Sequence, residues 1–553
     1  MDLKNIIKNK VRLNTIVISG ILIGIFLRFY HFGSPPVGLA SDEASIIYES
    51  FSLSETGNDR WGYSYPVYFI SWGSGQNTLY AYLSIPFVKY FGLNLLSVRI
   101  ISGILGMFTL LFVFLLLLNL LKKNQWALIG TLLYTFNPWH FMVSRWGFEE
   151  NPVPFFVILG LYLLFKTQDL LSENRKLVFN EKFLILISWL PFAVMLYTYA
   201  STLFVISIFI PLFTFLNYTF IKKQISLYLS SLIIFIIVAF PFLLFILKNN
   251  ILKKTLEIEK GLPFSLPLML YERDRLIKPI SDKIREIYEN SSLIYRSLSD
   301  KNVYNVTSLG VPHFFSFLAL IGIIYSFDKY RNNNNLKFGT LLAWGISSLT
   351  IFLLFYVNLN RSIHLQSIIP VYILLGLYFL SITLKDNLKK YFIITITSVF
   401  VFMSSVFMIE YFKKYPQYSN FVIDFDDAIL KAETFRQKDE NIAVTPTLIQ
   451  NYLYTCVYTK FPPAEFQKAN WKHANNRPYV YSFGHYYMLG TIEYYALDIY
   501  QNNIDLLANQ KSNIYIVKNS EKPTDGTSQL LYSNKFWSIY RCQKTKNFTW
   551  NRS

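Results

Sequence analysis

The feature that most constrains this chain is its repetition of long apolar runs. A membrane-spanning helix needs about 20 mostly apolar residues, and about eleven runs of that character follow one another. They cover 14–32, 96–121, 126–143, 152–165, 183–199, 201–218, 227–247, 311–327, 338–357, 363–383 and 391–409. Because lipid offers no hydrogen bonds to an open backbone, such runs predict an α-helical polytopic membrane protein of about 11 transmembrane helices.

The distribution of positive charge predicts the orientation of these helices. The formal net charge is +18, which invites a nucleic-acid interpretation, but the basic residues recur in alternate connections. They are Lys4, Lys8, Lys10, Arg12, Lys122, Lys123, Lys166, Arg175, Lys176, Lys182, Lys222, Lys223, Lys329, Arg331, Lys337, Lys385, Lys389 and Lys390. Cytoplasmic connections are enriched in Lys and Arg. We therefore expect a cytoplasmic N-terminus, a C-terminal region outside the cytoplasm, a bilayer as partner and no nucleic acid.

Two modules are expected along the chain. Residues 1–409 form the transmembrane module, with outer loops at 33–95, 144–151 and 248–310. Within the first loop, 43–53 has the pattern of a helix at the membrane surface. The run 78–91 fits half a span or a second surface helix, and we favour the surface helix because a full span there would invert the charge pattern downstream. Residues 410–553 alternate strand-like and helix-like segments, which predicts a small extracytoplasmic α/β domain.

The two cysteines, Cys456 and Cys542, both fall in the C-terminal region. An oxidising compartment would permit a disulfide between them. Two buried thiols fit the sequence equally well, since their separation in space does not follow from it.

Ionisable residues gather in the predicted outer connections. They are Asp42, Glu43, Glu149 and Glu150 among the acids, and Arg145, Arg273, Arg275 and Arg361 among the bases. An enzyme acting on a lipid-carried substrate needs a carboxylate to accept a proton and cations to hold a phosphate. Structural explanations compete with this one. The acidic pair after the first run can start a helix, the second pair can form a solvated turn with Arg145, and Arg361 can be an interfacial anchor. Arg99 is expected to be structural.

The order of several motifs resembles a known family. The resemblance is carried by these motifs, in chain order: Arg28-Phe29-Tyr30 followed by Ser41-Asp42-Glu43-Ala44; Asp59-Arg60-Trp61-Gly62 with Gly75-Gln76; Asn137-Pro138-Trp139-His140 through Ser144-Arg145-Trp146-Gly147-Phe148-Glu149; and Asn358-Leu359-Asn360-Arg361. They resemble polytopic GT-C glycosyltransferases of the protein O-mannosyltransferase and aminoarabinose-transferase type, which are glycosyltransferase family 39-like. The resemblance covers roughly 14–410 and extends to the C-terminal region only in placement.

The resemblance implies a hexosyl- or pentosyltransferase of the cell membrane. Its donor would be a polyprenyl-phosphate-linked sugar, and its acceptor a protein, lipid or cell-envelope glycan on the outer face. Carried over, Asp42 would be the general base on the acceptor or would orient the acceptor, Glu43 would support Asp42, and Glu149 would be the second acid of the site. Arg361, Arg145 and Arg273 would hold the donor phosphate. Some family members bind a divalent metal near such carboxylates, but this sequence has no clear His or Cys ligand set, so no cofactor is certain and a divalent metal is left open.

Two other classes of function were weighed. A transporter or flippase of lipid-linked sugars should have ionisable residues or broken helices near mid-membrane and a repeat between its halves. Here the long runs are nearly free of charge in their middles and no internal repeat is found. A membrane-anchored binding ectodomain would not need so many spans.

Overall fold

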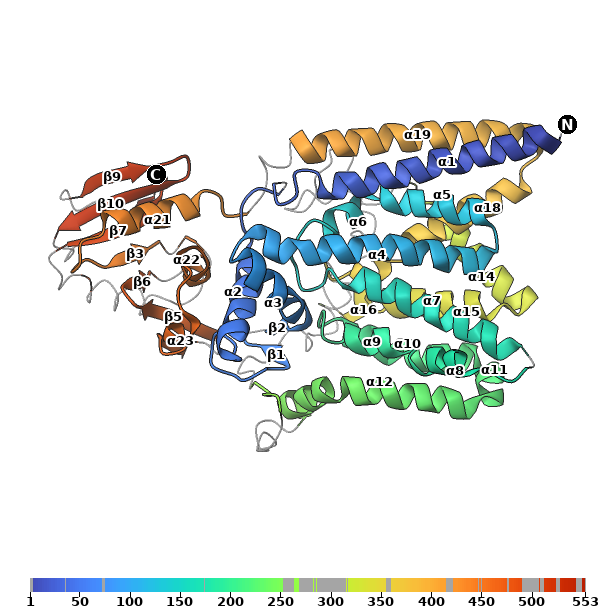
Figure 1. The fold of residues 1–553 in the computed structure, drawn as a ribbon, viewed down its shortest axis with the longest axis horizontal. Coiled ribbons are helices and arrows are strands. Elements are labelled where there is room, and N and C mark those ends of the chain that lie inside the picture. The colour runs from blue at the N-terminus through green and yellow to red at the C-terminus, as the bar shows by residue number, and fades with distance from the viewer. Residues whose placement is uncertain are drawn as a thin grey trace.

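The computed structural model places a bundle of helices beside a smaller C-terminal domain (Figure 1). It describes residues 3–552 except 35, 72–74, 174, 252–262, 268–281, 283–284, 286–314, 316, 355–359, 414–420, 446, 449, 475–476, 490–506, 508–511, 524–527 and 544–549. The N-terminus lies at the end of the bundle opposite the C-terminal domain. The Lys-bearing connections between α4 and α5 and between α18 and α19 lie at that same end, so the segregation of charge along the sequence is also a segregation in space.

Helices make up the bundle. They are α1 (Leu3–Phe29), α4 (Leu95–Leu121), α5 (Asn124–Thr135), α6 (Pro138–Val143), α7 (Val153–Ser172), α8 (Phe179–Leu186), α9 (Leu190–Met195), α10 (Thr202–Leu216), α11 (Tyr218–Lys223), α12 (Ile225–Ile246), the π-helix η1 (Leu247–Ile251), α14 (Leu318–Asn333), α15 (Leu336–Leu349), α16 (Ile351–Leu354), α17 (Ile363–Gln366), α18 (Ile369–Thr383) and α19 (Asp386–Lys413). In the described part of the chain, 6 helical stretches are long and apolar enough to cross a membrane. The multi-pass helical fold is therefore confirmed, whereas the number of eleven spans is not.

Prolines divide two of the predicted runs into shorter helices. The run 126–143 becomes α5 and α6, where Asn137 accepts a hydrogen bond from the His140 N–H (3.0 Å) and Pro138 opens the second helix. The run 183–199 becomes α8 and α9, with Pro191 in the first turn of α9. Proline lacks the N–H that a continuing helix needs but suits a helix start, because that N–H would be unpaired there.

A small outer layer lies between the bundle and the C-terminal domain (Figure 1). It consists of α2 (Ser41–Thr56), α3 (Leu79–Phe91) and the strand pair β1 (Tyr68–Phe69) and β2 (Gln76–Asn77). The two helices predicted for the first outer loop are thus confirmed as helices. Gly57 ends α2 in the left-handed conformation (φ 72°), which an L side chain adopts at a cost.

The C-terminal domain contains a mixed sheet of seven strands in the order β4-β5-β6-β3-β7-β10-β9. Its elements are α21 (Phe425–Phe435), β3 (Ile442–Val444), α22 (Asn451–Thr459), α23 (Pro463–Phe466), β4 (Asn470–Ala474), β5 (Arg477–Phe483), β6 (Tyr486–Met488), β7 (Ser512–Lys518), β9 (Gln529–Ser533) and β10 (Trp537–Gln543), with β8 (Glu521–Pro523) and β11 (Trp550–Arg552) forming a separate pair. Strand β3 runs parallel to β6 and β7, and the other pairs in the sheet are antiparallel. The predicted α/β character is confirmed, and Cys456 and Cys542 are buried thiols. The boundary at 409/410 remains a prediction.

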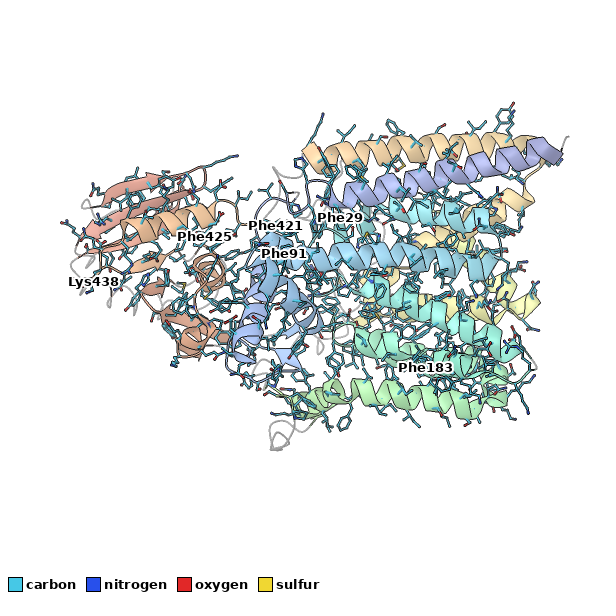
Figure 2. The ribbon with its side chains drawn as sticks, viewed as in Figure 1. Phe29, Phe91, Phe183, Phe421, Phe425 and Lys438 are labelled. Carbon is cyan, nitrogen blue, oxygen red and sulfur yellow. The ribbon has the colours of Figure 1, made fainter. Side chains whose placement is uncertain are left out.

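The outer layer and the C-terminal domain share one hydrophobic core. It joins Ile47 and Tyr48 of α2 to Leu453 and Val457 of α22, and it continues to Phe483 of the sheet. A second, larger core fills the helix bundle. Figure 2 shows Phe421 and Phe425 at the junction, close to the layer that carries the first acidic pair. The C-terminal domain is therefore packed against the outer layer.

Candidate active site

Asp42 lies in the first turn of α2. Its neighbour in that turn is Glu43, and acidic groups there interact favourably with the helix dipole. The side chain of Asp42 is exposed to solvent, whereas Glu43 is fully buried. Surrounding protein nevertheless limits the hydration of the Asp42 carboxylate, and this, together with the charge of Glu43, raises its pKa to about 6. Asp42 is thus an accessible carboxylate poised to exchange a proton near neutral pH.

Glu43 is held by four hydrogen bonds. Arg99 of α4 donates from Nε and Nη2 to its two carboxylate oxygens (2.7 and 2.8 Å). The backbone N–H of Gly147 donates to Oε1 (2.9 Å), and that of Ala40 donates to Oε2 (3.2 Å). This fork-shaped pairing fixes both partners, so Glu43 joins α2, α4 and the second outer connection at one point. Arg99, expected to be structural, is part of this clamp.

Residues of the second outer connection complete the acidic site. Asn77 of β2 donates its backbone N–H to Glu149 Oε2. Glu150 is buried, and this burial, together with the charge of Asp42, raises its pKa to about 8. The Gly147 N–H of the same connection donates to Glu43, which lies beside Asp42, so the geometry brings the two connections together. The fold thus gathers acids from two connections that are about a hundred residues apart in sequence.

The C-terminal domain also reaches this site. Leu39 and Val422 exchange backbone hydrogen bonds (both 3.0 Å) just before α2 begins. The Tyr454 side chain of α22 lies near the side chain of Ser41, next to Asp42. Further along α2, Tyr48 donates its hydroxyl to the Phe461 carbonyl (3.0 Å). Contacts of this domain therefore fix the start of the helix that carries Asp42.

The predicted phosphate-binding arginines have different surroundings. Arg145 is buried and donates to the carbonyls of Leu27 (3.0 Å), Arg28 (2.6 Å) and His31 (3.0 Å), around the C-terminal end of α1. A cation at that end of a helix interacts favourably with the helix dipole. Arg361 is half-buried just before α17. Arg273 lies outside the described residues.

A divalent metal was left open by the sequence. Among the described residues there is no group of three or more His, Cys, Asp or Glu side chains placed to hold one. Both oxygens of Glu43 are already engaged by the four donors named above. The arrangement does not fit a metal centre built from these side chains, and the chemistry proposed below contains no metal step.

Some contacts in the site had no signal in the sequence. Asn77 acts through its backbone, which any residue type could supply. Tyr454 is one of 40 tyrosines in the chain and lies about 400 residues after Ser41. The sequence predicted an α/β domain at 410–553, and this prediction indicated only in general terms that one of its helices, such as α22, could pack against the outer layer.

Comparisons with known proteins identify the fold. No protein-family model matches the sequence, and no curated protein matches it either. Among solved structures, ArnT from Cupriavidus metallidurans bound to undecaprenyl phosphate superposes with a TM-score of 0.54 at 11% identity, covering 95% of this chain and 97% of that chain. The archaeal oligosaccharyltransferase AglB from Archaeoglobus fulgidus, in complex with an inhibitory peptide and a dolichol-phosphate, gives 0.51 at 12% identity, covering 90% and 69%. The helix bundle, outer layer and C-terminal domain described above therefore constitute a GT-C glycosyltransferase fold.

Proposed function

We propose that this protein transfers a sugar from a polyprenyl-phosphate donor to a hydroxyl or amine acceptor at the outer face of the membrane. The observation that carries the proposal is the accessible Asp42 carboxylate, held beside the fixed Glu43–Arg99 pair. The similar solved structures support the donor class, since one contains undecaprenyl phosphate and the other dolichol-phosphate.

The proposed reaction is a direct displacement. Asp42 accepts the proton of the acceptor hydroxyl or amine while the acceptor atom forms a bond to the anomeric carbon of the sugar. The bond from that carbon to the phosphate oxygen breaks, and polyprenyl phosphate leaves with the electron pair. A phosphate is already a good leaving group, so one base and nearby cations suffice, in contrast to the two carboxylates of glycoside hydrolysis.

The remaining site residues take supporting roles in this proposal. Glu43 positions Asp42 by fixing the first turn of α2 through Arg99. Glu149 is the second acid of the site, held by the Asn77 N–H. Arg361 is the proposed phosphate ligand, with Arg273 as a helper. Arg145 was also expected to contact the phosphate, and its bonds to the α1 carbonyls make it the weakest of the three proposals.

The positive-inside distribution supports the outer face as the place of reaction. The Lys-bearing connections between α4 and α5 and between α18 and α19 lie at the end of the bundle away from α2, the helix that carries Asp42. Since such connections are normally cytoplasmic, the site and the C-terminal domain would lie outside. Accessibility labelling of single cysteines introduced at Lys123 and at Asp426 would test this orientation, because only the second should react with an impermeant reagent in intact cells.

Transfer can be tested with purified full-length protein in lipid nanodiscs. Undecaprenyl-phosphate-linked hexose and pentose are supplied with an envelope extract, and release of undecaprenyl phosphate is measured. Asp42→Asn should lower the rate of release by about a hundredfold to ten-thousandfold. Asp426→Asn is a matched control, since Asp426 is also exposed in the first turn of a helix but lies in the C-terminal domain. Release by Asp42→Asn at the wild-type rate would overturn the role of Asp42, and no release by the wild type from either donor would overturn the activity.

A further inference from the structure

A buried charge in the outer layer lies outside the acidic site. Arg60 is fully buried, and its Nε lies 3.3 Å from Oε1 of Glu49, which is equally buried. The Arg60 backbone N–H donates to the other oxygen of Glu49 (2.9 Å). Burying an ion pair costs several kcal/mol of desolvation per ion, which mutual attraction and good hydrogen bonds must offset. A pair retained at that cost calls for a reason beyond packing.

The turn before Arg60 explains how the chain delivers it to α2. Asp59 Oδ1 accepts hydrogen bonds from the N–H groups of Trp61 and Tyr63 (both 2.9 Å), which closes a tight turn around residue 60. Gly62 completes this turn with a φ of 91°, a conformation that glycine adopts without strain. The turn directs the Arg60 side chain into the interior of the outer layer rather than into water.

From there the guanidinium connects α2 to the strand pair. Arg60 Nη2 donates to the carbonyl of Ile70, directly after β1 (3.2 Å). Arg60 Nη1 donates to Ser45 Oγ on α2 (2.7 Å), and Ser45 donates in turn to Gln76 Oε1 in β2 (2.8 Å). The bonds from Arg60 through Ser45 to Gln76 have one consistent direction of donation. We call this chain of three side chains the Arg60 relay.

The relay ends beside the acidic site. Gln76 is followed by Asn77, whose N–H donates to Glu149. Ser45 lies on the same helix as Asp42, less than one turn further on. The Arg60 relay therefore joins the helix that carries the proposed base to the strand that holds the second acid.

We propose that Arg60 is a positioning residue, which acts through Ser45 and Gln76 to fix the place of Glu149 relative to Asp42. This inference rests on the proposed function, since Asp42 and Glu149 matter for catalysis only if the transfer occurs. Displacement of a catalytic group by about 1 Å can cost about a hundredfold in rate. Loss of the relay should therefore lower kcat, by about tenfold to a hundredfold, without a matching change in donor KM.

The chain offers a matched pair of substitutions for the test. Ser45 and Ser50 are both buried on α2. Ser45 belongs to the relay, whereas Ser50 donates to the carbonyls of Ile46 (2.7 Å) and Ala81 (2.9 Å). Ser45→Ala and Ser50→Ala each remove one buried hydroxyl from the same helix. They differ in whether the bond to Gln76 is lost.

The first measurement does not depend on activity. Hydrogen–deuterium exchange of the full-length protein in nanodiscs should show about tenfold faster exchange in the peptide containing Asn77 for Ser45→Ala, and less than a twofold change for Ser50→Ala. Unchanged exchange in Ser45→Ala, or equal acceleration in both variants, would overturn the relay. This result stands whether or not the protein transfers sugar.

The second measurement is the rate of undecaprenyl phosphate release. Ser45→Ala should lower kcat at least tenfold with donor KM within twofold of the wild type, while Ser50→Ala keeps kcat within twofold. Faster exchange in Ser45→Ala with an unchanged kcat would overturn the positioning role. If the wild type itself releases no undecaprenyl phosphate, the proposed function fails, and the positioning role fails with it, while the exchange result still decides whether the relay exists.

Discussion

The raised pKa of Asp42 makes the pH dependence of transfer a sharp test of its role. The base must be ionised to accept a proton, so the rate should follow the fraction of Asp42 that is deprotonated. With a pKa of about 6, that fraction is about 0.9 at pH 7 and about 0.1 at pH 5. A carboxyl with its ordinary pKa of 3.8 would still be about 0.94 ionised at pH 5. The rate should therefore fall about tenfold between pH 7 and pH 5.

The assay is release of undecaprenyl phosphate at saturating donor, measured across this range in nanodiscs whose integrity is checked at each pH. Returning the pH 5 sample to pH 7 should restore the rate, which separates titration from inactivation. Removal of the base by Asp42→Asn should lower the plateau rate by about a hundredfold to ten-thousandfold. A wild-type rate that stays flat down to pH 5 would refute the assignment. So would an acid limb that persists in any residual activity of Asp42→Asn.

Three further predictions concern stability. Glu150 has a pKa of about 8 in the fold against an ordinary value of 4.5, so its protonated form stabilises the fold; this stabilisation is complete below about pH 4.5 and is lost as the pH rises through 8. The thermal midpoint of the wild type should therefore fall between pH 6 and pH 9, and that of Glu150→Gln should fall less. An equal fall in both proteins would contradict the prediction. Glu43→Gln breaks a buried ion pair and should cost about 3–5 kcal/mol, seen as a lower thermal midpoint in nanodiscs, whereas Glu55→Gln, exposed on the same helix, should match the wild type. Gly322→Ala would drive a Cβ into the Tyr372 carbonyl where α14 packs on α18, so it should lower the yield of folded protein in size-exclusion chromatography, and an unchanged yield would argue against this close packing.

Much of the fold followed from the sequence because its main determinant is local. Lipid requires each spanning segment to satisfy its own backbone, so apolar length alone marked the helices. The positions at which the apolar runs divide into separate helices were harder to predict. Asn137 and Pro138 act as a helix start only where the packing of the surrounding bundle permits a change in helix direction. In the C-terminal domain, the predicted alternation of strand-like and helix-like segments is confirmed in β7 and β10, whose residues 513–517 and 537–539 are buried. The two-residue strands β1 and β2 carry no periodic signal.

The sequence predicted which residues could form the site, but it did not predict which of them bond to one another. The sequence drew attention to Asp42 and Glu43 because two carboxylates next to a spanning run are costly. It could not show that Glu43 is claimed by Arg99, since a bidentate pair depends on the path of α4 past the start of α2. Arg145 looked like a free outer cation, but it is bonded to the end of α1. The sequence shows the charge of each residue and its position along the chain, whereas the hydrogen-bonding partner of each charged side chain depends on how the helices pack.

The core shared by α2 and α22 has a consequence for how the protein is made. Ile47 emerges from the ribosome some 400 residues before Leu453, and the two must meet for the outer layer to bury its apolar face. During synthesis of the whole helix bundle this face stays uncovered, so it is open to chaperones and proteases outside the membrane. A chain that stops before α22 would insert its spans yet leave the outer layer without its cover. Burial of this face therefore requires translation of the chain through α22.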